Sequence, residues 1–214
     1  MHIPMTSVMA KIYPQALLSK SLSPSSSSSE FMNSERETFT IWMKSLVFNS
    51  NGCTVFDSNG DIVYRIDNYN NKCSSEVYLM DLRGRVLFTI CRKKLRVFGR
   101  WEGYKCNDSM VEEKKPWFQV KKPCRILRRD MPCDVTVSQQ QGPSSHYKIV
   151  GKAGDLACQI VDQAGRLVAQ MTRKQSALGV VLGDDVLSLV VEPNTDNSLI
   201  MGLLVVHGLI NRRM

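Results

Sequence analysis

The hydrophobic positions of this chain follow one pattern along most of its length and another at its C-terminal end. From Thr38 onward, short runs rich in aromatic and β-branched residues alternate with polar breaks, which is typical of β-strands. Near the end, residues 198–210 read SLIMGLLVVHGLI and contain no charged side chain. A segment that is apolar on every side is either a helix buried all round or a membrane span. Because a span needs about 20 apolar residues, the length of this segment favours a core helix.

Polar residues on both sides of the apolar segment support this helix. Asn194, Thr195 and Asp196 precede it, and each can cap the first free backbone N–H groups. Arg212 and Arg213 follow it and suit the negative end of the helix dipole. The sequence therefore predicts a helix over residues 198–210, with both ends marked.

A second pattern, an apolar run followed by Asp-x-x-Gly and another apolar run, occurs three times. Asp starts a turn by accepting hydrogen bonds from the backbone that follows it, and Gly adopts the positive φ that the turn requires. Each copy therefore predicts a β-hairpin with a short loop. The three turns lie at residues 57–60, 81–84 and 162–165.

Further strand-like runs lie before, between and after these hairpins. They are residues 38–43, 45–48, 92–100, 117–121, 124–127, 134–137, 146–150, 178–182 and 186–191. We expect residues 178–182 and 186–191 to form a last strand pair around Gly183. The count is about ten to twelve short strands and one helix, which indicates a sandwich or a barrel. A sandwich has no place for a fully apolar helix, so the pattern predicts a mostly β fold, an antiparallel barrel closed around the helix.

The first 36 residues differ in composition from the rest of the chain. Residues 23–29 are almost pure serine around Pro24, and such a segment cannot bury enough apolar surface to stay ordered. We expect a disordered leader over residues 1–36 and a barrel domain over residues 37–214. The leader is poor in acidic residues, so a transit peptide is an alternative, and Met9 is an alternative start.

The net charge of +8 belongs to one middle segment of the 214-residue chain. Residues 92–129 hold 13 Lys and Arg against 4 Asp and Glu, whereas the remainder holds 15 against 16. This asymmetry suggests an anionic partner, either phospholipid headgroups or nucleic acid, and a solvated face is the alternative. The candidate lipid-binding residues are the basic side chains of two strand-like runs: Arg92, Lys93, Lys94, Arg96, Arg100, Lys121, Lys122, Arg125, Arg128 and Arg129. Phe98, Trp101 and Trp117 lie nearby in the sequence and are expected to touch a membrane interface.

No sequence motif indicates catalysis, a cofactor or a metal. The chain has no nucleophile elbow, P-loop, dinucleotide-binding glycine pattern, zinc-protease motif or EF-hand loop. Its seven cysteines are odd in number and form no C-x-x-C pair, so we expect reduced thiols that pack as small core residues in a cytosolic or nuclear protein. We expect no enzymatic activity and no cofactor.

Three residues within the predicted helix need a separate interpretation. His207 is expected to be a neutral core histidine with a satisfied hydrogen bond, with a role as a ligand as the alternative. Gly202 and Gly208 lower helix propensity, so we expect them to allow close packing between helix and strands.

Several of these segments together resemble the plant LURP-one-related family, which belongs to the tubby-like and phospholipid-scramblase superfamily. The resemblance is carried by residues 185–196 (DVLSLVVEPNTD), the apolar segment and the Ile-Asn-Arg that ends it, with further likeness in residues 55–69 and 87–95. It covers about residues 38–213. The family implies a barrel of about 12 antiparallel strands, tubby-like, around a central hydrophobic C-terminal α-helix.

The resemblance also implies a function. Tubby-like members are similar to membrane-tethered transcription factors that hold phosphoinositides through basic residues, scramblases are associated with lipid movement, and LURP-one-related proteins are linked to plant defence. We therefore expect a non-enzymatic, monomeric barrel that binds acidic phospholipid headgroups without a transmembrane span. The expected location is cytoplasmic, either peripheral at the plasma membrane or nuclear. The alternatives are a nucleic-acid-associated regulator and a scramblase-like lipid transporter.

Overall fold

The structure is a computed structural model of the chain. It describes residues 34–44, 51–68, 76–93, 99–106, 115–122, 132–138, 142–152, 154–176 and 178–211. Residues 1–33 lie outside this part, so the leader and its boundary at residue 36 stay predictions.

The described residues form twelve β-strands and one α-helix. The strands are β1 (Glu37–Trp42), β2 (Asn51–Phe56), β3 (Ile62–Asn68), β4 (Glu76–Asp81), β5 (Val86–Lys93), β6 (Arg100–Lys105), β7 (Phe118–Lys121), β8 (Cys133–Val137), β9 (Ser145–Gly151), β10 (Cys158–Asp162), β11 (Leu167–Arg173) and β12 (Val186–Val191). The helix is α1 (Asn197–Ile210). The predicted helix over residues 198–210 is thus confirmed.

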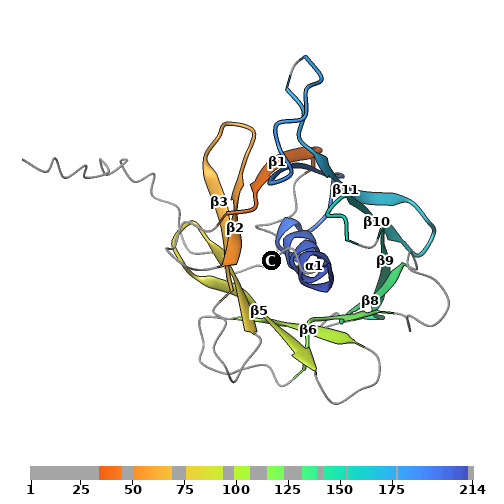
Figure 1. The fold of residues 1–214 in the computed structure, drawn as a ribbon. Helices are drawn as coiled ribbons and strands as arrows, with labels where there is room; N and C mark the ends of the chain where they lie inside the picture. Colours follow the sequence, from red (N-terminus) through yellow and green to blue (C-terminus); the bar gives the residue numbers. More distant parts are fainter. Residues whose placement is uncertain are drawn as a thin grey trace, which may run out of the picture. The chain divides into compact units, whose positions relative to one another are not determined.

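The strands form one closed antiparallel barrel in which each strand pairs with its neighbours in the chain. β1 closes the ring by pairing with β12, from Glu37 opposite Val191 to Trp42 opposite Val186. Figure 1 looks along the barrel, with α1 in its centre and the strands around it. The predicted fold class is therefore confirmed, and closure leaves this sheet without a free edge.

The helix and the inner face of the barrel share one hydrophobic core. Along β12, the inward residues Leu187, Leu189 and Val191 are buried, in alternation with half-buried outward ones. In α1, every residue from Asn197 to Gly208 is buried. A helix can be apolar on all sides here because strands surround it on all sides.

The N-terminus of α1 is capped by Asp196. Its Oδ1 accepts hydrogen bonds from the backbone N–H groups of Ser198 at 2.9 Å and Leu199 at 3.1 Å. Of the three predicted capping residues, Asp196 is therefore the one that caps the helix. Arg212 and Arg213 lie outside the described residues.

All three Asp-x-x-Gly turns join adjacent antiparallel strands, as predicted. Gly60, Gly84 and Gly165 have φ of 86°, 78° and 80°. Asp81 and Asp162 each also hold the arginine four residues later, with an oxygen-to-Nε distance of 2.7 Å in both pairs. The hydrogen bonds to these carboxylates hold the turn conformation, and all the residues involved lie within five positions of the sequence.

Two of the predicted strands are wrong. Residues 92–100 do not form one strand, because β5 ends at Lys93 and β6 begins at Arg100 directly opposite it. Residues 178–182 form an excursion between β11 and β12, with a single bridge from Gln175 to Val181. β12 pairs with β11 and β1 instead. The predicted strands at 45–48 and 124–127 lie outside the described residues.

His207 is buried, and its Nε2 lies 3.1 Å from the backbone oxygen of Asp155. Burial lowers the pKa of His207 below its usual value, which keeps the ring neutral. The core interpretation of His207 is therefore confirmed. Close packing at Gly202 is confirmed too, since a Cβ there would lie 3.0 Å from Cε1 of Phe118.

The expectation for the cysteines is confirmed only in part. Cys53, Cys133 and Cys158 are buried, and burial raises the pKa of Cys53 and of Cys158 to about 12. Cys91 is half-buried and Cys106 is exposed, so these two are not core residues. The remaining two cysteines lie outside the described residues.

Candidate functional site

The order of the strands places the predicted basic residues that the structure describes at one end of the barrel. Consecutive strands run in opposite directions, so every odd-numbered strand finishes at the same end. We call this the exit end, because the last turn of α1 also lies there. At that end, the backbone N–H of Gly154, between β9 and β10, donates to Oδ1 of Asn211, which follows α1.

Five of the ten predicted lipid-binding residues are described, and all five lie at the exit end. Arg92 and Lys93 finish β5, Arg100 starts β6, Lys121 finishes β7 and Lys122 follows it. The other five, Lys94, Arg96, Arg125, Arg128 and Arg129, lie outside the described residues. Thus the two basic runs, separated in the sequence, reach the same end of neighbouring strands.

Three of these side chains form a row across the outer surface of the barrel. Lys93 is directly opposite Arg100, and Arg100 is directly opposite Lys121. Directly opposite residues share a face of the sheet, and the alternate positions Trp101 and Val120 are buried inside. We call Lys93, Arg100 and Lys121 the cation row.

A buried carboxylate, which the sequence analysis missed, lies beside the cation row. Glu102 is 6% exposed, and its oxygens lie 2.7 Å from Arg100 Nη2 and 3.4 Å from Lys93 Nζ. The Tyr104 hydroxyl donates to the same carboxylate at 2.6 Å. The i, i+2 spacing of Arg100, Glu102 and Tyr104 was the available signal, because alternate strand residues share a face.

These partners determine the ionisation of Glu102. Burial alone raises its pKa, but the hydrogen bond from Tyr104 and the charges of Arg100 and Lys93 outweigh burial, and the pKa lies below its usual value of 4.5. Glu102 therefore stays ionised near neutral pH and offsets part of the positive charge. The row keeps a positive excess, because its three cations face one carboxylate and Lys121 is exposed. Arg92 is also exposed but lies opposite Trp101, on the other face of the sheet.

The lowered pKa of Glu102 predicts a specific acid sensitivity. A carboxyl group with a lowered folded-state pKa contributes stability above its unfolded-state pKa and loses it as the pH falls further. We expect the difference in unfolding free energy between wild type and Glu102→Gln to be constant above about pH 5.5 and to narrow below pH 4.5. Urea unfolding of both proteins from pH 7 to pH 3 measures this difference. A difference that stays constant down to pH 3 would contradict the assignment.

Two of the aromatic residues that were expected near the basic residues do not lie beside the cation row. Trp101 is buried, with the Arg92 guanidinium 6.0 Å from its ring centroid. Trp117 precedes β7 at the opposite end of the barrel, where Lys105 lies 4.8 Å from its ring. Phe98 lies outside the described residues. Neither tryptophan is placed beside the cation row: strand alternation turns Trp101 inward, and Trp117 lies immediately before β7, at the other end from Lys121. Their contact with a membrane stays a prediction.

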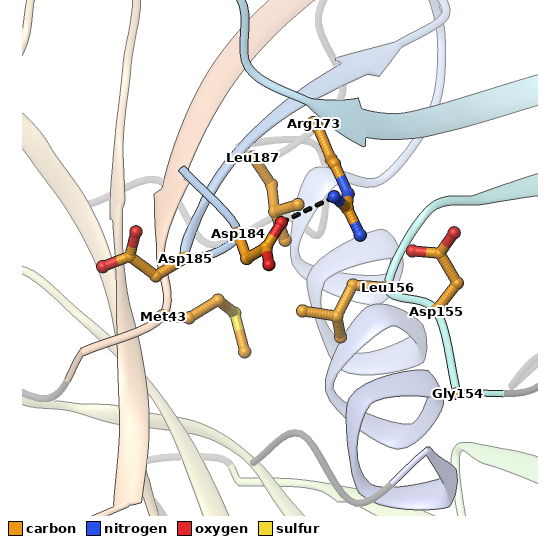
Figure 2. A pocket seen from close by; sticks show the side chains of 8 residues that line it. All are labelled: Met43, Gly154, Asp155, Leu156, Arg173, Asp184, Asp185 and Leu187. Atoms are coloured by element: carbon orange, nitrogen blue, oxygen red, sulfur yellow. Dashed lines mark hydrogen bonds and ion pairs between the residues drawn. The ribbon is translucent and has the colours of Figure 1, made fainter. Parts of the chain in front are cut away.

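A cavity of about 220 Å³ also opens at the exit end (Figure 2). Met43, Leu156 and Leu187 supply apolar side chains to its lining, and the polar part of the lining comes from Gly154, Asp155, Arg173, Asp184 and Asp185. None of these residues was predicted as a site, since Gly-Asp-Asp at 183–185 was read only as a turn. They come together through three different connections between strands, which the sequence does not show.

Each carboxylate that lines this cavity forms an ion pair or a hydrogen bond with another group of the protein. Asp184 pairs with Arg173 at 2.6 Å, and Asp185 pairs with Lys44 at 3.4 Å. Asp155 Oδ1 accepts from the backbone N–H of Ala157 at 3.2 Å. Within the described part of the chain, no group of three or more His, Cys, Asp or Glu side chains is arranged to hold a metal ion.

Among the described residues, no helix combines the length and the apolar character needed to cross a membrane.

Comparisons with known proteins agree on one family. A family model described as LURP-one-related matches residues 37–208. The chain is 47% identical over 209 residues to the protein LURP-one-related 11 of Arabidopsis thaliana, covering 95% of this chain and 89% of the relative. It is 43% identical to LURP-one-related 4 of the same plant, covering 94% and 87%.

A solved structure supports the fold independently. The X-ray structure of a protein from Arabidopsis thaliana superposes with a TM-score of 0.58 at 18% identity, covering 86% of this chain and 96% of that one. At this identity, the similarity concerns the fold alone.

Proposed function

The chain belongs to the LURP-one-related family, and we propose that it is a non-enzymatic barrel that binds acidic phospholipids, phosphoinositides included, at a membrane surface. The observation that carries this proposal is the cation row, three basic side chains brought side by side on the outside of β5, β6 and β7. Arg92 and Lys122 lie at the same strand ends.

Electrostatics supports a membrane partner for this surface. Each Lys or Arg held near an anionic bilayer contributes about 1 kcal/mol of attraction. The described exit-end residues of β5 to β7 alone supply several such charges, and Glu102 offsets one of them. Such binding is salt-dependent, because added ions screen exposed charges beyond about 8–10 Å.

The two alternatives from the sequence have less support. A scramblase-like transporter would need α1 in the lipid, but α1 lies inside the barrel, where its side chains form the core. A nucleic-acid-binding regulator would use the same positive surface, so it is distinguished by experiment. The described surface carries no exposed recognition helix of the kind that reads a DNA groove.

Charge reversal at two exposed residues tests the proposal. Arg92→Glu with Lys121→Glu leaves the Glu102 pairs intact, and we expect binding to phosphatidylserine or phosphoinositide vesicles to weaken by at least about tenfold. The measurement is vesicle flotation or co-sedimentation over a range of salt concentrations. The matched control is Lys105→Glu with Lys115→Glu, which changes the net charge equally at the opposite end of the barrel.

Three outcomes would contradict the proposal. Equal recovery of wild type with neutral and anionic vesicles at all salt concentrations would remove the electrostatic basis. Equal weakening by both double variants would show that the exit end has no special role. Tighter, salt-sensitive binding to random duplex DNA than to vesicles in parallel gel-shift assays would favour the nucleic-acid alternative.

A further inference from the structure

The connection between β11 and β12 exposes a cluster of aliphatic side chains. Leu178, Val180, Val181 and Leu182 are 91%, 63%, 46% and 52% exposed. Single exposed apolar residues are common on protein surfaces, but a contiguous group indicates an interaction site. We call these four residues the aliphatic tip. Figure 1 shows this blue connection standing away from the barrel wall.

The backbone of the aliphatic tip is hydrogen bonded within the connection itself. Ser176 accepts through its backbone oxygen from Gly179 N–H at 2.9 Å and through Oγ from Val180 N–H at 3.2 Å. The N–H of Ser176 donates to Val180 O at 2.8 Å, and that of Leu182 donates to Lys174 O at 3.0 Å. Internal hydrogen bonds lower the cost of moving a loop into an apolar phase, and these contacts satisfy the N–H groups of Ser176, Gly179, Val180 and Leu182.

The base of the connection is held in place by polar contacts. Arg173 pairs with Asp184 across the two strand ends at 2.6 Å, and the Lys174 ammonium donates to the Thr40 hydroxyl on β1. The tip is therefore a supported projection with Lys174 and the Arg173–Asp184 ion pair at its base. Long basic side chains at the base of an apolar projection suit the headgroup layer, while the aliphatic side chains reach deeper.

The aliphatic tip and the cation row lie at the same end of the barrel. β11 finishes at Arg173 and β12 starts at Val186, at the end where β5 and β7 finish. In the closed strand order, β5–β7 lie across the ring from β11 and β12, so a membrane contacts both features when it faces the exit end of the barrel. This arrangement supplies an apolar contact at the end of the barrel where the cation row lies.

We propose that the aliphatic tip inserts into the interfacial region of an acidic membrane while the cation row holds the headgroups. This inference rests on the proposed function and adds a second, apolar contact to it. A bilayer is the favoured occupant because four side chains on a projection are too few for a stable protein interface, which buries about 800 Å² on each partner. A fluid bilayer needs no complementary shape.

Replacing two tip leucines tests the inference. We expect Leu178→Ser with Leu182→Ser to weaken binding to phosphatidylserine vesicles by about tenfold or more, because two leucines lose their apolar contact. The matched control is Leu82→Ser with Leu167→Ser, two exposed leucines at the opposite end, one in the turn after β4 and one at the start of β11. The control should bind within about twofold of wild type, and thermal unfolding checks that all variants fold.

A spectroscopic measurement places the tip directly. Leu178→Trp should show a blue-shifted emission component and quenching by brominated phosphatidylserine vesicles, whereas Leu82→Trp should show neither. The emission shift and the quenching of each variant are measured as differences from wild type, because wild type already contains three tryptophans.

The outcomes separate this inference from the proposed function. If wild type does not bind anionic vesicles, both are overturned. If Arg92→Glu with Lys121→Glu weakens binding but the tip variant binds like wild type, and Leu178→Trp is not quenched, the inference alone is overturned. Concentration-dependent dimers of wild type that the tip variant loses would assign the tip to a second copy of the chain and also overturn it.

Discussion

The Leu204→Asp variant is expected to lose its cooperative fold. Leu204 is 4% exposed and lies on the central helix, whose neighbours are the apolar inner residues of the barrel. The gap beside it, bordered by Ile41, Val55 and Met201, has a volume of about 10 Å³. That is at or below the space a single water needs, so the new carboxylate would be neither hydrated nor paired.

The cost of this change is comparable to the whole stability of a domain. An unpaired buried charge costs several kcal/mol, against about 5–15 kcal/mol for the total. The measurement is the soluble yield and the thermal unfolding transition of the purified variant. Leu178→Asp is the matched control, because Leu178 is 91% exposed and the same substitution there should leave unfolding unchanged. Soluble Leu204→Asp protein with a cooperative transition near that of wild type would contradict the role of α1 as core.

The second large effect is expected at Gly103, on β6. A Cβ at this position would lie 2.2 Å from Cε1 and Cζ of Phe118, the residue directly opposite on β7. The ring has little room to move away, because Gly202 of α1 lies on its path: a Cβ on Gly202 would be 3.0 Å from the same Cε1. Phe118 therefore fills the space that two glycines, one from the wall and one from the helix, leave open.

We expect Gly103→Ala to lower the unfolding free energy by about 3 kcal/mol, at the upper end of the usual range for overpacking a core. Gly99→Ala is the control, since a Cβ there meets nothing within 4 Å. Urea unfolding measures both. Adding Phe118→Leu should make the cost of Gly103→Ala smaller than in the wild-type background, because the smaller side chain removes the clash. If the losses of unfolding free energy caused by Gly103→Ala and Phe118→Leu are strictly additive in the double variant, the Gly103→Ala effect does not come from a clash with Phe118.

The cation row and the aliphatic tip contribute different kinds of interaction to the proposed membrane contact. The cation row supplies long-range attraction that salt weakens, and the aliphatic tip supplies short-range burial that salt does not screen. The tip variant should therefore keep the salt dependence of wild type at lower overall affinity, whereas Arg92→Glu with Lys121→Glu should flatten it.

The errors of the sequence interpretation have a common cause. Residues 92–100 look like a strand because Leu95 and Val97 alternate with basic residues, yet the chain reverses between Lys93 and Arg100. Residues 178–182 look like a strand because they are aliphatic, yet they lie exposed on the aliphatic tip. Propensity reports which backbone a residue tolerates, and the available pairing partners decide whether a strand forms there.

The sequence by itself determined the elements whose encoding is local. The Asp196 cap and the uninterrupted apolar run specify α1, and three Asp-x-x-Gly turns specify three hairpins, because each depends on contacts within a few residues. Closure around α1 also followed from the sequence, because a helix apolar on every side needs a wall on every side. Only the tertiary structure decided which strand ends meet. Register brought Lys93, Arg100 and Lys121 into one row, placed Glu102 beside them and moved Trp117 to the far end. Such neighbours depend on pairing between segments far apart in the chain, which no local pattern of residues records.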